Sequence, residues 1–427
     1  GIRSGDIIKA VDGISVEELS PEEVQGLTVG EPGTNVTLTI ERYGVTRSLT
    51  FELTRELVEV KNVDYYSLIG PGQDIGYIML SRFSQNAAEE IRKAIEYFQA
   101  QTELKGLILD LRNNPGGLLE EAVKTVDKFV GPGLMVVETR GRLNEHNSIF
   151  KTEEPAMLGE LPLVILQNNG SASASEIVSG ALQDLDRAVV IGEQSFGKGL
   201  VQVVRPLSYN TALKITTSRY FIPSGRSIQS ITYTHDERNS QISKPDSLRR
   251  AFKTRNGRTV YDGHGIAPDI KVTIPSPTLL ETTLYQQSPF FNFATQYASE
   301  HETFATGDIS DDLFSQFKTF LDKQNFSYHT QTEHYLAQVE AELREENRSG
   351  SDLESHIVAL KRMAAQKKES ELDRQKERLK QILYQELVSR YEGTQGQIAA
   401  SIKTDPAVKE ALSVLESIPH YHDILGN

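Results

Sequence analysis

The stretch NNGSASASEIVSGALQDLDRAVVIGEQSFGKGLVQ, residues 168–202, decides the fold of the central part of the chain. It follows an apolar run that predicts a strand over 161–167, and it contains a predicted helix over 174–183 and a predicted strand over 188–192. Strands that alternate with helices of this length form βαβ units with right-handed crossovers. We therefore expect residues from about 70 to 275 to form an α/β core.

The same alternation begins upstream of this stretch. Residues 75–80 and 106–111 predict strands, and Asn86 is expected to cap a helix between them. The loop 113–117, with the sequence NNPGG, joins the second strand to a further helix predicted over 118–130. Open α/β sheets place their sites at the carboxyl ends of their strands, so this loop is a candidate part of a site.

The N-terminal part of the chain has the pattern of a small β domain with one helix. Asp12-Gly13 is a hairpin signal, and Ser20 followed by Pro21 is a strong helix start with acidic residues in the first turn. A half-buried strand is predicted by three alternating apolar residues, which are Val36, Leu38 and Ile40.

The chain beyond the boundary at Pro275-Ser-Pro277 is predicted to be helical, with a break at 349–352. Residues 361–380 are highly charged and predict a solvated helix. An apolar stripe follows, for which packing onto the chain's own domain is favoured over a partner-binding or coiled-coil role; its residues are Ile382, Leu383, Leu387, Val388 and Tyr391. The predicted domains are therefore 1–57, 58–275 and 276–427.

The composition excludes several classes of function. A net charge of −14 and the lack of a basic stripe argue against nucleic-acid binding. The chain has no cysteine, which excludes disulfides, thiolate metal sites and a cysteine nucleophile.

No apolar run approaches the roughly 18–20 residues that span a bilayer. Because the sequence begins Gly-Ile-Arg, we expect a fragment or a processed form. His420 and His422 lack a third ligand nearby, and no metal or cofactor is predicted.

The residue types in 168–202 suggest acyl transfer without a catalytic histidine. Ser173 lies among small residues at a predicted helix start, and Lys198 lies between two glycines. The free Ala174 N–H at the helix start could face a tetrahedral oxyanion, and Gly116 or Gly117 could supply a second amide. These residues form a candidate serine–lysine site.

Other interpretations of the serine segment stay open. Ser173 and Glu176 have the S-x-x-E spacing of a capping box, so the hydroxyl could act only as a helix cap. The loop 113–117 could be an ordinary helix-entry turn.

Lysine can act as a base only when it is neutral, and burial lowers the pKa of an ammonium group. Gln202, four residues beyond Lys198, could point into the same cavity and hydrogen-bond the amine without adding charge. Two other motifs fail. Residues 192–198 fit the start of a P-loop, but Gly199 replaces the required Ser or Thr. The S-x-x-K of 195–198 lacks the companion motifs of β-lactamases.

Four segments, in this order and spacing, resemble the C-terminal-processing (tail-specific) serine peptidases, which use a Ser–Lys dyad. They are LDLRNNPGGL at 109–118, SASASE at 171–176, FGKGLVQ at 196–202 and YDGHGIAPD at 261–269. The resemblance covers about residues 65–275 and implies an α/β (α+β overall) fold with a crotonase-like βαβ peptidase core.

The resemblance implies a serine endopeptidase that needs no cofactor. Ser173 would be the nucleophile, Lys198 the general base and Gln202 the residue that orients the lysine. The amides of Ala174 and of Gly116 or Gly117 would form the oxyanion hole. Expected partners are proteins or peptides with accessible C-termini, and the expected location is the periplasm or cell envelope. A homo-oligomer formed through the helical C-terminal region is a further expectation.

Residues 1–57 resemble the second half of a PDZ domain. The half that carries the carboxylate-binding loop is missing, so we do not expect capture of a C-terminus by β-augmentation. Two alternatives remain: a non-catalytic scaffold on a degenerate peptidase fold, and a peptidase that is inactive in this truncated form.

Overall fold

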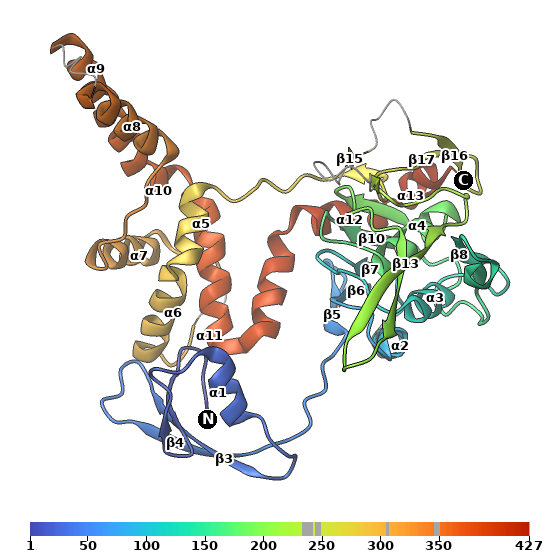
Figure 1. Ribbon diagram of the computed structural model, residues 1–427, viewed down its shortest axis with the longest axis horizontal. Helices are drawn as coiled ribbons and strands as arrows, with labels where there is room; N and C mark the ends of the chain where they lie inside the picture. The colour runs from blue at the N-terminus through green and yellow to red at the C-terminus, as the bar shows by residue number, and fades with distance from the viewer. Residues whose placement is uncertain (233–241, 244–248, 305–306, 346–350, 427) are drawn as a thin grey trace. The chain divides into compact units, whose positions relative to one another are not determined.

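The computed structural model describes residues 1–232, 242–243, 249–304, 307–345 and 351–426 (Figure 1). Its contacts divide the chain into two units. The helical unit comprises Gly1–Val58 and Pro275–Thr404, and the sheet unit comprises Glu59–Ile274 and Asp405–Asn427. The region predicted as one helical domain, 276–427, is therefore divided between the two units.

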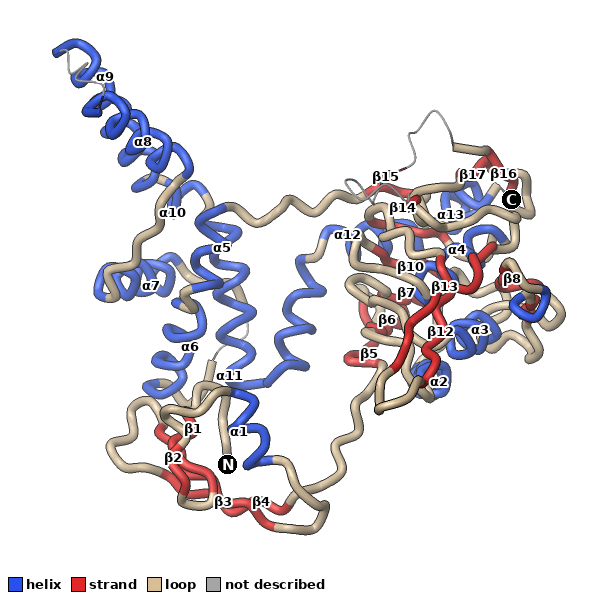
Figure 2. Tube along the Cα trace, in the orientation of Figure 1, coloured by secondary structure: helices blue, strands red, loops and turns tan. Residues whose placement is uncertain are grey.

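A six-stranded sheet forms the centre of the sheet unit, with the order β18-β11-β10-β7-β6-β5 (Figure 2). All neighbouring strands are parallel except the β5–β6 pair. The bounds are β5 Val63–Ile69, β6 Ile75–Leu80, β7 Gly106–Asp110, β10 Leu163–Gln167, β11 Val189–Gly192 and β18 Ile270–Lys271. The mixed α/β fold and its predicted strands are confirmed. The parallel register aligns the carboxyl ends of β7, β10 and β11, so the loops that follow them leave the same edge.

Both faces of this sheet are buried. Leu163 and Ile165 of β10 belong to one apolar core together with helices α2 (Ala87–Gln101), α3 (Leu119–Asp127) and α4 (Ala174–Asp184). Val164 and Leu166, which point to the opposite face, are also fully buried. The last two helices, α12 (Pro406–Glu416) and α13 (Ile418–Leu425), contact β10 and β11. Burial of these helices explains why 405–427 belongs to the sheet unit.

Asn86 departs from its predicted role. It stands at the N-cap position of α2, but its φ is +71° and its side chain makes no capping hydrogen bond. Asparagine tolerates this left-handed backbone better than most residues, which accounts for its presence at the helix start.

A second sheet in this unit has the order β12-β13-β8-β9. Strands β12 (Leu200–Pro206) and β13 (Ala212–Phe221) form an antiparallel ribbon that is largely exposed along β12 and the first half of β13. The other elements of the unit are β8 Met135–Gly141, η1 Asn144–His146, β9 Ser148–Lys151, β14 Ile231–Thr232, β15 Ile242–Ser243, β16 Ala251–Lys253 and β17 Thr259–Tyr261.

The helical unit begins with a four-stranded antiparallel sheet of order β2-β1-β3-β4, packed with helix α1 (Pro21–Thr28) around a small apolar core. The predicted helix start is confirmed, because the Ser20 N–H donates to Glu23 Oε2 at 2.8 Å and the helix carries a complete capping box. The strands are β1 Ile7–Val11, β2 Ile14–Ser15, β3 Asn35–Glu41 and β4 Leu49–Thr54.

The rest of the helical unit consists of helices around an aromatic-rich core. The apolar stripe that was predicted to pack internally does so, since Ile382, Leu383 and Leu387 are buried in this core. The helix predicted over 361–380 is present, but turns at Ser370 and Gln375 divide it among three successive helices. The bounds are α5 Leu279–Gln286, α6 Pro289–Glu300, α7 Asp311–Lys323, α8 Gln331–Glu345, α9 Ser351–Glu369, α10 Glu371–Arg374 and α11 Lys376–Thr404.

Gly393, at a φ of +67°, interrupts the helical backbone of α11. The break predicted at 349–352 lies partly outside the described residues, and α9 begins at Ser351. Among the residues that the structure describes, no helix is both long and apolar enough to cross a membrane.

Candidate active site

Three loops meet at the carboxyl edge of the central sheet. They follow β7, β10 and β11 and contain residues 111–118, 168–173 and 193–199. Side-chain hydrogen bonds join the first two loops: the Asn113 N–H donates to Asn168 Oδ1, and Asn168 Nδ2 donates to Asn113 Oδ1, both at 2.9 Å. The loops that contain Gly116, Gly117 and Ser173 are thus joined to each other at this edge of the sheet.

The three serines of the SASAS segment have different environments. The buried Ser171 hydroxyl donates to the Leu111 carbonyl at 2.8 Å, and the buried Ser175 hydroxyl donates to the Asn114 carbonyl at 2.9 Å. Ser173 lies between them at the start of α4, is only half-buried, and has a φ of +55°. A non-glycine residue in this conformation carries strain of about 1–3 kcal/mol, which is found most often at functional sites. Ser173 therefore differs from Ser171 and Ser175 in its exposure and its backbone conformation.

Asn114 holds the glycine loop against the serine segment. Its fully buried side chain donates from Nδ2 to the Leu80 carbonyl at 2.8 Å, and its Oδ1 accepts the Gly116 N–H at 2.9 Å. Its main-chain carbonyl accepts the Ala172 N–H at 3.0 Å. One asparagine therefore connects β6, the glycine loop and the segment before Ser173.

The two glycines of the loop have different roles. A Cβ on Gly116 would lie 2.6 Å from the Ala172 carbonyl oxygen and 2.9 Å from the Ser173 Cβ, so only glycine fits this close to the serine. The Gly116 amide is already bonded to Asn114. Gly117 is exposed, and within the described residues neither its N–H nor that of Ala174 donates to another protein group. Those two amides are the ones available to an oxyanion.

Glu176 connects the serine to the lysine. Its fully buried carboxylate accepts two hydrogen bonds at each oxygen. Oε2 accepts the Ser173 N–H and the Lys198 N–H, both at 2.8 Å. Oε1 accepts the Ser195 hydroxyl and the Gly197 N–H, both at 2.6 Å. The main-chain nitrogens of Ser173 and Lys198 are thus no farther apart than twice 2.8 Å.

The capping-box spacing indicated only part of this role. The Glu176 carboxylate does return to the Ser173 N–H, as that pattern predicts. Three of its four donors come from residues 195–198, which local spacing does not reveal. Burial raises the pKa of Glu176, and the hydrogen bonds from Ser195, Lys198, Ser173 and Gly197 oppose that rise.

In the sequence, Ser195 falls only within the S-x-x-K pattern that lacks its companion motifs. In the structure, its buried hydroxyl donates to Glu176 and accepts the Ile266 N–H at 2.7 Å. Gly265, at a φ of +66°, leaves room for this contact, because a Cβ there would lie 2.4 Å from the Ser195 hydroxyl oxygen. The only sign of this role in the sequence is the position of Ser195, two residues before the pair Gly197-Lys198.

The main chain at Lys198 is tightly packed, but its side chain is exposed. A Cβ on Gly197 would lie 2.4 Å from the Ser230 side chain, and one on Gly199 would lie 2.6 Å from the Gln229 nitrogen. The flanking glycines therefore fix the lysine backbone, as the sequence suggested. Burial of the amine was also expected, and it is not found. The cause is that Lys198 leads directly into the exposed β12–β13 ribbon.

Gln202 lies on β12, paired with Thr216, and its side chain is exposed. Strand β12 begins only at Leu200, and its register with β13 shifts between Val201 and Gln202. The two-residue periodicity of a regular strand therefore does not extend from Lys198 to Gln202. Regular strand geometry therefore does not place Lys198 and Gln202 on one face, and their approach to a common cavity stays a prediction.

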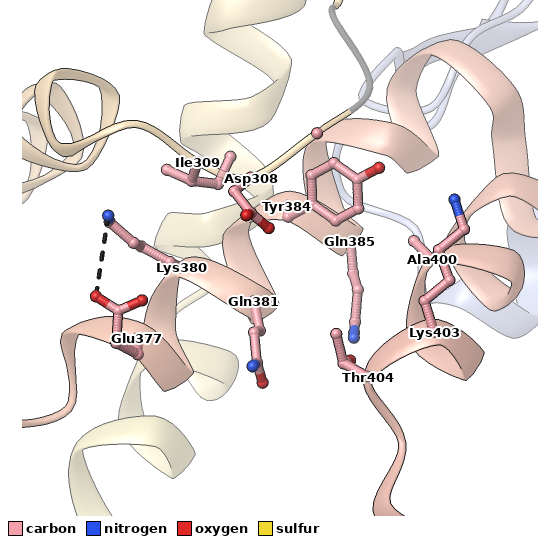
Figure 3. Close-up of a pocket in the computed structure, with 11 residues that line it drawn as sticks. Asp308, Ile309, Glu377, Lys380, Gln381, Tyr384, Gln385, Ala400, Lys403 and Thr404 are labelled. Carbon is pink, nitrogen blue, oxygen red and sulfur yellow. Dashed lines mark ion pairs between the residues drawn. The ribbon is translucent and has the colours of Figure 1, made fainter. Parts of the chain in front are cut away.

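A pocket of about 460 Å³ lies in the helical unit, between the two halves of α11 and the segment before α7 (Figure 3). Its lining is mixed in charge and includes Asp308, Lys380, Tyr384 and Lys403. It contains none of the predicted site residues.

Three segments of the chain match models of known protein families. Residues 74–238 match the model of peptidase family S41, and this range contains Ser173, Lys198, Gln202 and the glycine loop. This segment of the chain is therefore similar to peptidase family S41. Residues 1–42 match a PDZ domain, and residues 280–415 match the C-terminal helical domain of a probable PDZ-protease. The S41 match thus lies between two other recognised modules.

Two curated relatives of this chain are named as processing proteases. The carboxy-terminal-processing protease of Bartonella bacilliformis is 43% identical over 239 residues, covering 55% of this chain and 54% of that protein. The carboxyl-terminal-processing protease of Synechocystis sp. is 38% identical over 238 residues, covering 56% and 55%. The chain spans about half the length of these relatives. A solved photosystem II D1 C-terminal processing protease is 30% identical, with a TM-score of 0.37 and 64% of each chain covered.

Proposed function

We propose that the chain is a serine endopeptidase that cleaves protein substrates near their C-termini through a Ser173–Lys198 dyad. The observation that carries this proposal is the shared hydrogen-bond acceptor. One oxygen of Glu176 receives the main-chain amides of both residues, although they are 25 positions apart in the sequence. This clamp holds the backbones of a strained serine and a lysine within side-chain reach of each other.

In the proposed mechanism, the neutral Lys198 amine takes the proton of the Ser173 hydroxyl as the oxygen attacks the scissile carbonyl. The amides of Ala174 and Gly117 donate to the oxyanion that forms. Lys198 then returns the proton to the leaving amine, and it later activates the water that hydrolyses the acyl-enzyme. Gln202 orients the lysine amine. A bound substrate would cover the exposed amine.

The substrate class and the location are further parts of the proposal. The relatives' names indicate carboxyl-terminal processing, so we propose proteins or peptides with accessible C-termini as substrates. Resemblance to the same peptidases supports the periplasm or cell envelope as the location. The same resemblance supports a division of the chain into three functional regions, 1–57, 58–275 and 276–427. Residues 276–427 are a candidate region for homo-oligomer contacts.

The proposal is tested by peptide cleavage. The substrate is an unstructured peptide with an apolar C-terminus, and cleavage sites are mapped by mass spectrometry. The full chain is expected to cut near the C-terminus, and Ser173→Ala and Lys198→Ala are each expected to lower kcat by at least about 10⁴-fold. Ser179→Ala is a matched control on the same helix, because the buried Ser179 hydroxyl has no hydrogen-bond partner in the described structure.

The alternative function is a binding scaffold on a peptidase fold. It predicts that the wild-type chain binds the peptide without cutting it and that Ser173→Ala leaves the dissociation constant unchanged. Robust cleavage by either dyad variant would also contradict the proposed mechanism, because it would require another nucleophile or base.

A further inference from the structure

A buried polar cluster lies where β7 ends and the glycine loop begins. The fully buried Tyr77 hydroxyl donates to Asp110 Oδ2 at 2.6 Å. Arg112 folds back onto the same carboxylate, with Nε 3.0 Å from both oxygens and Nη2 2.6 Å from Oδ2. The remaining guanidinium nitrogen, Nη1, donates to Asp405 Oδ2 at 2.7 Å. Arg112 therefore joins an aspartate of the sheet to an aspartate from the end of the chain.

The charges in this cluster stabilise one another away from water. The side chains of Arg112 and Asp405 are only 11% and 19% exposed, and that of Asp110 is fully buried. Burial alone would lower the pKa of Arg112, but the carboxylates of Asp110 and Asp405 outweigh it and raise the pKa. The guanidinium is thus held by two carboxylates at fixed positions.

Asp405 has two roles at once. Its Oδ1 caps helix α12 by accepting the Ala407 and Val408 N–H groups at 2.8 and 3.1 Å. Its Oδ2 binds Arg112. Asp405 is also the residue at which the chain enters the sheet unit after Thr404, the last residue of the helical unit.

Arg112 is followed directly by the loop that carries the available amide. Asn113, with a φ of +58°, bonds to Asn168, and the buried Asn114 holds Gly116. The conformation of this loop is therefore set from its first residue, and the position of Arg112 sets the direction in which the loop starts.

We propose that Asp405 is a positioning residue for the Gly117 amide, acting through Arg112. The inference rests on the proposed function, because it concerns the oxyanion hole of that reaction. It extends the catalytic apparatus to a residue beyond the S41 match, which ends at 238, and within the helical-domain match, 280–415. That part of the chain had no assigned role in the chemistry.

The test separates the two roles of Asp405. Asparagine caps helices as well as aspartate does, so Asp405→Asn keeps the cap of α12 and removes the charge that binds Arg112. We expect kcat to fall about tenfold while KM changes less than about twofold, because an oxyanion contact forms only in the transition state. The rate of labelling by a fluorophosphonate, whose phosphoryl oxygen occupies the oxyanion hole, is expected to fall by a similar factor. Asp405→Glu, which restores the charge, is expected to recover part of the loss.

Asp423→Asn is the matched control, since it removes an exposed aspartate from the neighbouring helix α13. Unchanged kcat in Asp405→Asn would overturn the inference. The inference would also be overturned if Asp405→Asn and Asp405→Ser lost activity only in proportion to their loss of folded protein, measured by thermal unfolding. A wild-type chain that cuts no peptide would instead contradict the proposed function itself, which keeps the two failures distinguishable.

Discussion

The two sides of the candidate site differ in how firmly they are held. The serine side, residues 111–118 and 171–176, is fixed by buried hydrogen bonds from Asn114, Ser171 and Ser175. The lysine side, residues 197–206, is fixed only at its start. Its backbone is packed at Gly197 and Gly199, but the side chains of Lys198 and Gln202 are exposed, and β12 is an edge strand.

Under the proposed mechanism, this difference corresponds to a division of the catalytic work. Preorganised amides stabilise an oxyanion without reorganisation during the reaction, so the rigid serine side suits that role. A lysine base must lose its proton, and an exposed amine favours the charged form. The reactivity of the lysine side therefore depends on the group that covers it. Until that group binds, Glu176 keeps the lysine backbone in place.

The serine side should not tolerate an added methyl group at Gly116. A Cβ there would lie 2.6 Å from the Ala172 carbonyl oxygen, and the φ of +94° is strained for alanine. We expect Gly116→Ala to lower kcat at least about 100-fold, the size of effect seen when one oxyanion donor is lost. Gly131→Ala is the control, because its Cβ would have nothing within 4 Å. Similar kinetics in both variants would mean that the glycine loop is not rigid.

Breaking the link between the two sides should have the next largest effect. Glutamine has one acceptor oxygen in place of two, so Glu176→Gln leaves two of the four donors unpaired. We expect kcat/KM to fall about 10- to 100-fold, consistent with about 1.5–3 kcal/mol for a hydrogen bond to a charged group. A fall of less than about twofold would show that the clamp has no role in the reaction.

The pH dependence of activity and of thermal stability in the wild-type protein should report the ionisation of Glu176. Because burial raises the pKa of Glu176 in the folded state, its protonated form stabilises the fold, and that contribution is lost as pH rises through the raised pKa. Activity requires the ionised form and should change in the opposite direction. As pH falls through this range, we expect wild-type activity to decrease while its melting temperature rises relative to Glu176→Gln. Parallel changes in both measurements would contradict this account.

A smaller effect is expected from the residue that supports the clamp. The hydrogen bond from Ser195 lowers the pKa of Glu176, so its removal should raise that pKa further. In Ser195→Ala, the acid limb of the kcat/KM profile should shift to higher pH, with a loss of about three- to tenfold at neutral pH. Ser195→Thr keeps the hydroxyl and serves as the control. An unchanged acid limb in Ser195→Ala would show that Ser195 does not support Glu176 in the reaction.

The exposed ribbon should be the most tolerant part of the site. Val204 is 60% exposed and Tyr209 is 97% exposed. We expect Val204→Thr and Tyr209→Ser to change the free energy of unfolding by less than about 0.5 kcal/mol, measured by urea denaturation. A loss above about 1 kcal/mol would show that the ribbon is covered in solution and that the contrast between the two sides is false.

Sequence patterns predicted the parts of the site that local rules govern. The strand before Ser173 and the helix after it follow from a run of apolar residues and a helix-start signal. The partners of Glu176 do not follow from such rules, because three of its four donors come from a loop after the next strand. The predicted burial of Lys198 failed for a related reason. Flanking glycines show that a backbone is closely packed, but they contain no information on what covers the side chain.

The end of the chain illustrates the same limit. Residues 406–425 have an ordinary amphipathic helical pattern, which does not specify the surface that they cover. The structure packs them on the central sheet and brings Asp405 to Arg112, a contact across 293 residues of sequence. Contacts of this range depend on the assembled fold and have no local signal.

Activation of Ser173 by Lys198 can be tested by mapping where a serine-reactive probe attaches to the protein. The full chain is treated with a fluorophosphonate, digested and analysed by mass spectrometry. We expect one adduct on Ser173 in the wild-type protein and none in folded Lys198→Ala. An unlabelled wild-type chain, an adduct on another serine, or equal labelling of the two proteins would contradict it.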